Sequence, residues 1–326
     1  GAWCNLGAGT SNSNVKNTGD QVSFRIDMNK NPKIELSVVI PFTNIVVLKE
    51  NYLEVIRQSI GFPIEFILVF DLGSPFESDF KNDDSLLARE KEFAADNVSL
   101  IKGKFENPGG ARNEGIKRAR GEWIAFWDSD DSVNWLKVLD GIAKAKSESE
   151  VLIFDFEVRN QKDLSTKQHK ANGDLRLVAI NPGIWRMVFR RNLVAGKKFP
   201  DLLLGEDQCF LLEINVFSSR ICLIDDVVYT YVKGNPDQLT SRIDKENDIF
   251  LALKLAIKLV RKPTRMSIFY YIVVIRMFLT TLKIGNMISK CGGLAIIIFN
   301  FFTATNKQRL LLLNAFNFVF KHRNIL

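Results

Sequence analysis

Short apolar runs alternate with amphipathic segments between residues 36 and 127, and this alternation is the clearest structural signal in the chain. The runs LSVVIPF (Leu36–Phe42), IEFILVFDLGS (Ile64–Ser74) and EWIAFW (Glu122–Trp127) are rich in β-branched and aromatic residues. Continuous apolar runs of this length are typical of strands that are buried on both faces. A further short strand is expected at VSLIKG (Val98–Gly103).

The segments between these strands have helical periodicity. NYLEVIRQSI (Asn51–Ile60) predicts one helix, and GGARNEGIKRARG predicts another, with Ala111, Gly115 and Ala119 four residues apart and Gly121 placed to end it. Strands that alternate with helices predict an α/β fold with a mostly parallel sheet. In such sheets, ligands bind beyond the carboxyl ends of the strands.

The composition limits the kinds of catalytic and metal-binding sites that the chain could form. The chain has 326 residues, of which 46% are hydrophobic, so it can form a sizeable core. With only two histidines, His169 and His322, a Ser-His-Asp triad or a His-rich metal site is not expected, and catalysis should depend on carboxylates. The cysteines lack metal-ligand spacing, which favours free thiols in a reducing compartment; they are Cys4, Cys209, Cys222 and Cys291.

Charge divides the chain into an acidic body and a basic end. After Asp248 there is no Asp or Glu but there are 12 Lys and Arg residues, whereas the first 248 residues carry 32 basic and 37 acidic side chains. The acidic body argues against nucleic-acid binding. We therefore expect a catalytic domain over residues 31–248 and a mainly helical, basic and apolar tail over 249–326.

The tail predicts membrane association. Its first helix has a cationic face and is otherwise apolar, and such helices commonly lie in the membrane interface and bind anionic lipid; that face contains Lys254, Lys258, Arg261, Lys262 and Arg265. The alternative is that these helices pack on the catalytic domain. No signal peptide is expected, and no apolar stretch reaches the roughly 18 residues that a membrane span needs.

Residues 1–30 are polar and rich in Gly, Asn and Ser. The segment NLGAGTSNSN is similar to one rung of a left-handed β-helix, although such folds need about three or more repeats. We expect either a trace of such a domain or an unrelated extension.

A cluster of carboxylates follows the strand at Glu122–Trp127. Asp128, Asp130 and Asp131 repel one another unless a cation or strong donors compensate, and carboxylate oxygens suit Mg²⁺ or Mn²⁺. Alternatively, Asp131 or Ser132 caps the helix predicted at VNWLKVLDGIAKA. A calcium-binding EF-hand loop fits badly, because its sixth position would be a valine rather than a glycine.

Four segments in order resemble family 2 glycosyltransferases with the GT-A fold. They are LSVVIPF, ILVFDLGS, NPGGARNEGIKRARGEWIAFWDSDD and LLLGEDQCF, and the likeness extends from Leu36 to Arg242. It is strongest to bacterial enzymes that build capsule, lipopolysaccharide and other surface glycans. The Gln-x-x-Arg-Trp signature of processive synthases is missing, so one sugar per encounter is expected.

The resemblance implies a nucleotide-sugar site. Its residues would be Pro41, Thr43, Asn44, Asp71, Gly110, Arg112, Asp128, Ser129, Asp130 and Lys233. Asp71 would bind uracil, and Arg112 would lie near the nucleotide. Asp130 would hold the metal that bridges the diphosphate, and Asp128 would support the ribose and the metal shell. The alternatives are that Asp71 forms a turn with Gly73 and that Arg112 is a solvated helix charge. The family's usual second Asp is Leu72 here, and the His that accompanies the basic loop residue is absent.

The resemblance also implies an acceptor side. Asp207 would be the catalytic base with Glu206 beside it, while Trp185 and Asp131 would contact sugar. The alternatives are capping of the helix QCFLLEINVF and a core position for Trp185.

We therefore expect a metal-dependent inverting enzyme that transfers a sugar, from a UDP-sugar, to a glycan or lipid-linked acceptor at the cytoplasmic face of the membrane. The alternatives are a sugar-1-phosphate nucleotidyltransferase and a non-catalytic assembly partner with the same fold.

Overall fold

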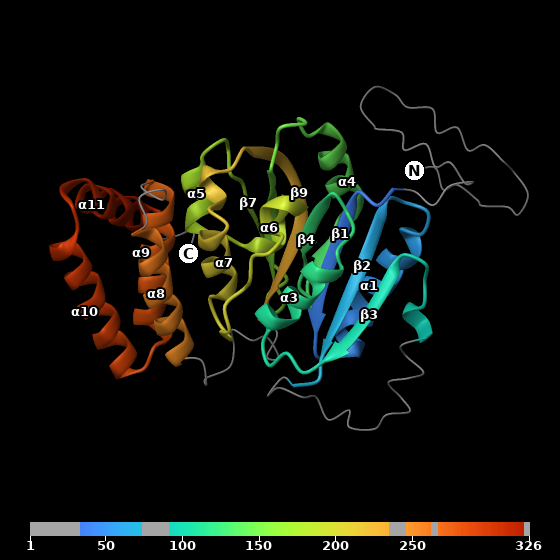
Figure 1. Ribbon diagram of the computed structural model, residues 1–326, viewed down its shortest axis with the longest axis horizontal. Helices are drawn as coiled ribbons and strands as arrows, with labels where there is room; N and C mark the ends of the chain where they lie inside the picture. The colour runs from blue at the N-terminus through green and yellow to red at the C-terminus, as the bar shows by residue number, and fades with distance from the viewer. Residues whose placement is uncertain (1–32, 74–90, 235–245, 262–266, 323–326) are drawn as a thin grey trace, which may run out of the picture.

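The computed structural model describes residues 33–73, 91–234, 246–261 and 267–322, and these residues form a mixed sheet covered by helices (Figure 1). The nine strands within these described residues are β1 (Leu36–Phe42), β2 (Ile64–Asp71), β3 (Val98–Gly103), β4 (Trp123–Phe126), β5 (Ser132–Val133), β6 (Val151–Asn160), β7 (Thr166–His169), β8 (Met187–Arg190) and β9 (Ile221–Lys233). The possible β-helix rung within residues 1–30 lies outside the described residues.

The order of the strands is β3-β2-β1-β4-β8-β6-β9-β5, with β7 paired to β6. Strands β3, β2, β1 and β4 run parallel, β8 runs antiparallel to both of its neighbours, and β6 and β9 are parallel again. The chain moves outward from β1 to β3 and then returns to the other side of β1 as β4. Ligand sites form at such a reversal, between the carboxyl ends of the two strands.

The helices cover both faces of the sheet. They are α1 (Ile45–Gln58), α3 (Pro108–Arg118), α4 (Trp135–Lys144), α5 (Leu175–Ile180), α6 (Arg191–Val194), α7 (Glu206–Glu213), α8 (Glu246–Val260), α9 (Ile268–Ile284), α10 (Met287–Thr303) and α11 (Asn306–Lys321). Short 3₁₀ turns occur at η1 (Lys91–Phe93), η2 (Ile184–Arg186) and η3 (Val216–Ser218). Helices α1 and α4 share a core with one face of β1, and α3, α5, α7, α8 and α9 share a core with the other.

The predicted α/β class and helical C-terminal region are confirmed, and several boundaries differ. Strands β1 and β3 have the predicted ends, but α1 begins six residues before the expected helix. It begins there because the Asn44 side chain accepts hydrogen bonds from the backbone of Val46 and Val47 at 2.9 and 3.4 Å. Helix α3 ends at Arg118, ahead of Gly121.

The C-terminal helices form the end of the molecule farthest from β3 (Figure 1). Helices α8 and α9 bury large apolar side chains in the main core, for example Leu253 and Ile275. The apolar face of α8 therefore packs on the α/β part of the molecule, as the second interpretation of the tail expected, while Lys254 and Lys258 are exposed. In the described part of the chain, no helix is both long and apolar enough to cross a membrane.

Helix α3 lies unusually close to β1 because of a glycine. A Cβ atom at Gly115 would lie 2.3 Å from Cγ1 of Val39, well inside van der Waals contact. Any side chain at this position would push α3 off the sheet, and α3 is the helix that carries Arg112.

We predict that Gly115→Ala destabilises the protein by about 1–3 kcal/mol, because the added methyl group overpacks the core. Urea unfolding measures this change. Lys117→Ala on the exposed side of the same helix should change stability by less than about 0.5 kcal/mol. Combining Gly115→Ala with Val39→Ala should cost less than the sum of the single changes, and additive costs would contradict the steric explanation.

Candidate active site

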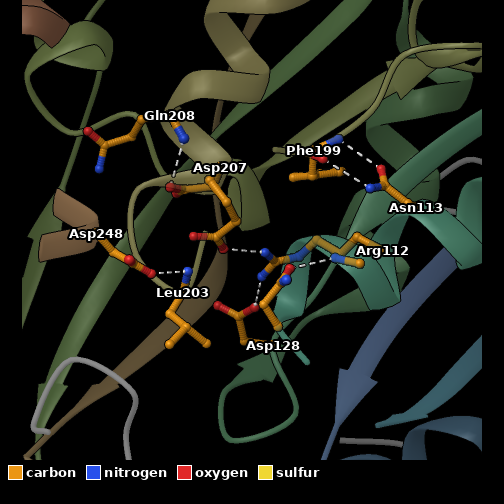
Figure 2. A network of polar contacts seen from close by, with 11 residues as sticks. Arg112, Asn113, Asp128, Phe199, Leu203, Asp207, Gln208 and Asp248 are labelled. Carbon is orange, nitrogen blue, oxygen red and sulfur yellow. Dashed lines mark hydrogen bonds and ion pairs between the residues drawn. The ribbon is translucent and has the colours of Figure 1, made fainter. Parts of the chain in front are cut away.

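The site lies where β1, β2 and β4 end, and it is organised around one buried arginine. Arg112, from α3, is only 5% exposed. Its Nη2 donates to Oδ1 of Asp128 at 2.7 Å, and its Nη1 donates to Oε1 of Glu206 at 2.7 Å. Figure 2 shows Arg112 lying between Asp128, which follows β4, and the beginning of α7. The alternative of a solvated helix charge is therefore wrong.

Electrostatics keep this arginine charged. Burial alone would lower the pKa of Arg112, but the charges of Asp128, Glu206 and Asp207 outweigh that effect and raise it. The Nε atom of Arg112 is buried and has no hydrogen-bond partner in the structure. One cation thus joins the two carboxylate motifs that the sequence placed 78 residues apart.

The segment from Asp128 to Asp131 is held from two sides. From α1, the Tyr52 hydroxyl donates to the Asp128 carbonyl at 2.9 Å, and the Asn51 amide donates to the Ser129 carbonyl at 3.1 Å. From β9, the Tyr229 hydroxyl accepts from the Asp128 amide and donates to Oδ2 of Asp131 at 2.8 Å. These contacts fix the backbone so that the carboxylates of the motif keep their orientation.

Asp131 supports this segment from inside. It is 0% exposed, and its Oδ1 accepts from the Val232 amide at 2.7 Å. Burial, followed by the charges of Asp130 and Asp128, raises its pKa well above the usual range. These contacts favour a structural role over the predicted sugar contact.

The capping alternative for these acids is wrong. Helix α4 is capped by Asn134, whose side chain accepts from the Lys137 amide at 3.2 Å. Residues 132 and 133 instead form β5, which pairs with β9. Asp131 and Ser132 therefore do not cap the helix.

The second pair of acids begins α7. Gly205 precedes it with a φ of +83°, a left-handed conformation that glycine adopts without strain. Burial raises the pKa of Glu206 to about 7, with a further increase from Asp207 and a decrease from Arg112. Burial also raises the pKa of Asp207, whose Oδ1 accepts from the Gln208 amide at 2.7 Å. The N-cap of α7 is Gly205, without a side-chain cap hydrogen bond, and Asp207 lies inside the first turn, so the capping alternative is wrong. The raised pKa makes the carboxylate of Asp207 a stronger base.

The C-terminal helices complete the surroundings of this pair. Oδ2 of Asp248 accepts from the Leu203 amide at 2.7 Å (Figure 2). A Cβ atom at Gly205 would lie 2.9 Å from the Cβ of Ala252 in α8. From α9, the charge of Arg276 lowers the pKa of Asp207 and so opposes part of the burial effect.

The residues expected around the nucleotide occupy the neighbouring strand ends. Asp71 ends β2, and its Oδ1 accepts from the amides of Gly73, Phe105 and Glu106 at 2.9, 2.8 and 3.2 Å. The contact with Gly73 is the turn that the alternative interpretation predicted, so a uracil contact would have to use Oδ2.

Several other residues predicted for the nucleotide-sugar site lie at the end of β1 or the start of α3, where they stabilise the backbone. Pro41 belongs to β1, Thr43 follows that strand, and Asn44 caps α1. Gly110 donates its amide to the Asn107 side chain at 2.7 Å, and a Cβ atom there would lie 2.6 Å from the Phe105 carbonyl. Position 110 therefore requires glycine, because the backbone at the start of α3 lies close to the backbone of Phe105.

Trp185 and Lys233, predicted to contact the sugar and the nucleotide-sugar, differ in the exposure of their side chains. Trp185 is half-buried and stacks on Tyr229 at 4.4 Å between ring centroids and on Tyr231 at 5.9 Å. It is thus part of an aromatic cluster, as the core interpretation expected, and keeps some exposed surface. Lys233 is exposed at the end of β9. Most of the predicted loop that follows it lies outside the described residues.

Among the contributors that were not predicted are Tyr52, Tyr229 and Arg276. Tyr52 lies in an apparently ordinary amphipathic helix, and Tyr229 lies in a strand about 100 residues from the acids that it contacts. The sequence could have identified Arg276, which is the one arginine in the apolar run of α9. A charge in such a run is expected to be buried and therefore to need a partner of opposite charge.

The described residues contain no cluster of three or more His, Cys, Asp or Glu side chains able to hold a metal ion. A cation bound by one or two carboxylates and completed by substrate phosphates and water needs fewer protein ligands, and this is the usual arrangement for Mg²⁺. Asp128 and Asp130 supply suitable oxygen donors, with Oδ1 of Asp128 already bound to Arg112.

Comparisons with known proteins show the family of the chain. The family model named glycosyl transferase family 2 matches residues 37–217, more than half of the chain. The chain is 27% identical over 227 residues to the uncharacterized glycosyltransferase EpsJ of Bacillus subtilis (strain 168), a match that covers 63% of this chain and 62% of EpsJ. It is 26% identical over 167 residues to the poly(ribitol-phosphate) beta-N-acetylglucosaminyltransferase TarS of Staphylococcus aureus (strain MW2), covering 48% of this chain and 29% of TarS.

A solved structure shows the same fold. The crystal structure of S. aureus TarS 1–349 in complex with UDP-GlcNAc matches with a TM-score of 0.58 and 19% identity, over 86% of this chain and 79% of that one. The predicted GT-A fold is confirmed. The chain spans less than two thirds of the length of both EpsJ and full-length TarS.

We predict that Arg112→Ala lowers the free energy of unfolding by about 3–5 kcal/mol, because it leaves two carboxylates without their cation in a buried site. Arg112→Lys should cost less, since an ammonium keeps the charge but cannot donate in two fixed directions. Denaturant unfolding measures both. Arg118→Ala, at an exposed position of the same helix, is the control and should cost less than about 0.5 kcal/mol. Equal effects of the two alanine substitutions would contradict the role of Arg112.

We also predict a pH effect from Glu206. Because its pKa rises from 4.5 to about 7 on folding, the folded state retains a proton that the unfolded state has lost between these values. The stability contribution of Glu206 is therefore complete below pH 4.5 and is lost as pH rises toward 7. In thermal unfolding from pH 4.5 to 8, Glu206→Gln should become progressively more stable relative to wild type as pH rises. A constant difference across this range would exclude the raised pKa.

Proposed function

The chain belongs to glycosyl transferase family 2, and from this membership and the geometry of the site we propose that it transfers one sugar from a nucleotide-sugar to an acceptor hydroxyl with inversion. The observation that carries the proposal is the contact of Arg112 with both Asp128 and Glu206. It places the motif expected at the donor diphosphate beside the motif expected to supply the base. Sugar transfer requires both groups in one site.

Asp207 is proposed as the base. It would accept the proton of the acceptor hydroxyl while that oxygen attacks the anomeric carbon and the bond from this carbon to the diphosphate oxygen breaks. Glu206 is less suited, because its Oε1 is engaged by Arg112. Burial raises the pKa of Asp207, which makes its carboxylate a stronger base.

The donor is proposed to be a UDP-sugar. This extends to the present chain what is known of the TarS fragment, which shares its fold and binds UDP-GlcNAc. Asp71, at the end of β2, would contact uracil, and Asp128 and Asp130 would hold a divalent cation, Mn²⁺ or Mg²⁺. Such a cation would offset the charge on the departing nucleoside diphosphate.

The acceptor is proposed to be a glycan or lipid-linked intermediate of cell-surface polysaccharide synthesis. The named activity of TarS and the basic tail of this chain support that assignment. We also propose that the protein works at an anionic membrane surface, which would bring it to a lipid-linked acceptor.

We predict that Asp207→Asn lowers kcat by about 10²–10⁴-fold while binding of UDP persists, because only the proton acceptor is removed. Asp130→Ala should abolish the gain in UDP affinity that Mn²⁺ gives the wild type. Transfer from UDP-sugars measures the first effect, and calorimetric titration of UDP with and without Mn²⁺ measures the second. Glu213→Gln, at the far end of α7, is the matched control and should behave as wild type.

Two results would contradict the proposal. Full transfer by Asp207→Asn would exclude that residue as the base. Tighter binding of another nucleoside diphosphate than of UDP would exclude a UDP-sugar as the donor.

A further inference from the structure

Helix α10 packs on the main core through small residues and through the partly buried Ile296, Ile297 and Phe301, while its other large apolar residues are exposed. Its buried positions are Ser289 and Gly293. Its exposed large apolar residues are Met287, Ile288, Leu294, Ile298, Phe299 and Phe302. They are separated by steps of 1, 6, 4, 1 and 3 residues, which place them on one side of the helix. An ordinary surface helix turns its large apolar side chains toward the core and presents polar residues on its outer side, whereas α10 presents these six.

The inward side of α10 lies close to α8 and α9 at two glycines. A Cβ atom at Gly292 would lie 2.6 Å from the ring of Phe250 in α8, and one at Gly293 would lie 3.3 Å from Cγ2 of Thr281 in α9. Glycine therefore lets α10 approach these two helices closely, and the exposed apolar residues lie on the opposite side.

Helix α11, which follows α10 in the chain, also exposes large apolar residues. It buries Leu312, Ala315 and Val319. Its exposed large apolar residues are Leu310, Leu313, Phe316 and Phe320. We call these four residues, together with the six on α10, the α10–α11 face. Helix α10 lies on the far side of α8 and α9 from the sheet (Figure 1), whereas α11 runs back toward α5, where Arg176 lies over the Phe318 ring at 5.0 Å.

Charge indicates what covers this face. No Asp or Glu follows Asp248, and Lys283, Lys307 and Lys321 are exposed around it. A second copy of the chain docked through the same face would bring lysines together with no carboxylate from that region to pair with them, which opposes association. An anionic lipid surface offers both an apolar interior for the side chains and phosphates for the lysines.

We infer that the α10–α11 face docks on an anionic lipid bilayer, with its apolar side chains inserted at the boundary between headgroups and acyl chains. This inference rests on the membrane location proposed above and names the surface responsible. The basic face of α8 contributes less to membrane binding, since the apolar side of that helix is buried in the core and cannot insert into the bilayer.

Flotation of the full chain with vesicles tests the inference. Wild type should float with vesicles of phosphatidylcholine containing phosphatidylglycerol and should bind pure phosphatidylcholine far more weakly. The variant Ile288→Gln, Phe299→Gln, Phe302→Gln changes residues that are 79%, 60% and 71% exposed, so its fold should be intact, and its vesicle affinity should fall at least about tenfold. Lys307→Gln and Lys321→Gln should each weaken binding by up to about fivefold, less at high salt.

A matched control changes exposed apolar residues elsewhere. Ile60→Gln, Leu136→Gln, Leu164→Gln alters positions that are 55%, 49% and 78% exposed, and this triple variant should float as wild type does. Equal flotation of the two triple variants, or no flotation of wild type with anionic vesicles, would overturn the inference. So would a stable dimer of the wild type, measured by light scattering, that the α10 variant converts to monomer.

Titration with UDP separates this inference from the proposed function. An α10 variant that binds UDP normally but no longer floats supports the docking surface and leaves the enzyme assignment intact. Wild type that floats but binds no nucleoside diphosphate refutes the sugar transfer and leaves the docking surface standing.

Discussion

The structure depends on a single buried guanidinium that holds two carboxylates from different parts of the chain. Arg112 reaches Asp128 at the end of β4 and Glu206 at the start of α7, both at 2.7 Å. Removing these three charges from water is costly, and the cost is offset because each carboxylate faces the arginine at hydrogen-bonding distance. The arrangement requires α3 to lie against β1, which Gly115 permits. Packing of the sheet and geometry of the site are therefore set by the same helix.

Much of this could be predicted from local sequence. The predicted bounds of LSVVIPF and VSLIKG match those of β1 and β3. An apolar run between polar residues marks a strand through its own sequence, without information from distant segments. The acids at the ends of strands were identified for the same reason. What was missed involves contacts between distant segments. The start of α4 depends on the pairing of β5 with β9, and the support of Asp128 depends on Tyr52 and Tyr229. The family resemblance located Glu206 and Asp207, but it did not indicate that Arg112 binds the first of them.

The C-terminal helices combine two physical roles. The inner pair, α8 and α9, is continuous with the core and contacts the beginning of α7. The outer pair, α10 and α11, packs on the inner pair on one side and keeps large apolar side chains in contact with solvent on the other. A cationic, amphipathic sequence alone suggested that α8 meets the membrane. The distinction between inner and outer helices needed the packing, because apolar residues occur in all four.

The left-handed glycine before α7 has a consequence for how this protein could be recombined with its relatives. Gly205 lies against Ala252 of α8, so the beginning of the helix that carries Glu206 and Asp207 is shaped partly by a segment beyond the stretch that matches the family. A chimaera that joins this chain's catalytic domain to another member's C-terminal helices would have to keep a side chain as small as alanine at that position. Otherwise the foreign helix would displace the start of α7, and an exchange meant to change only the C-terminal helices would also move Glu206 and Asp207.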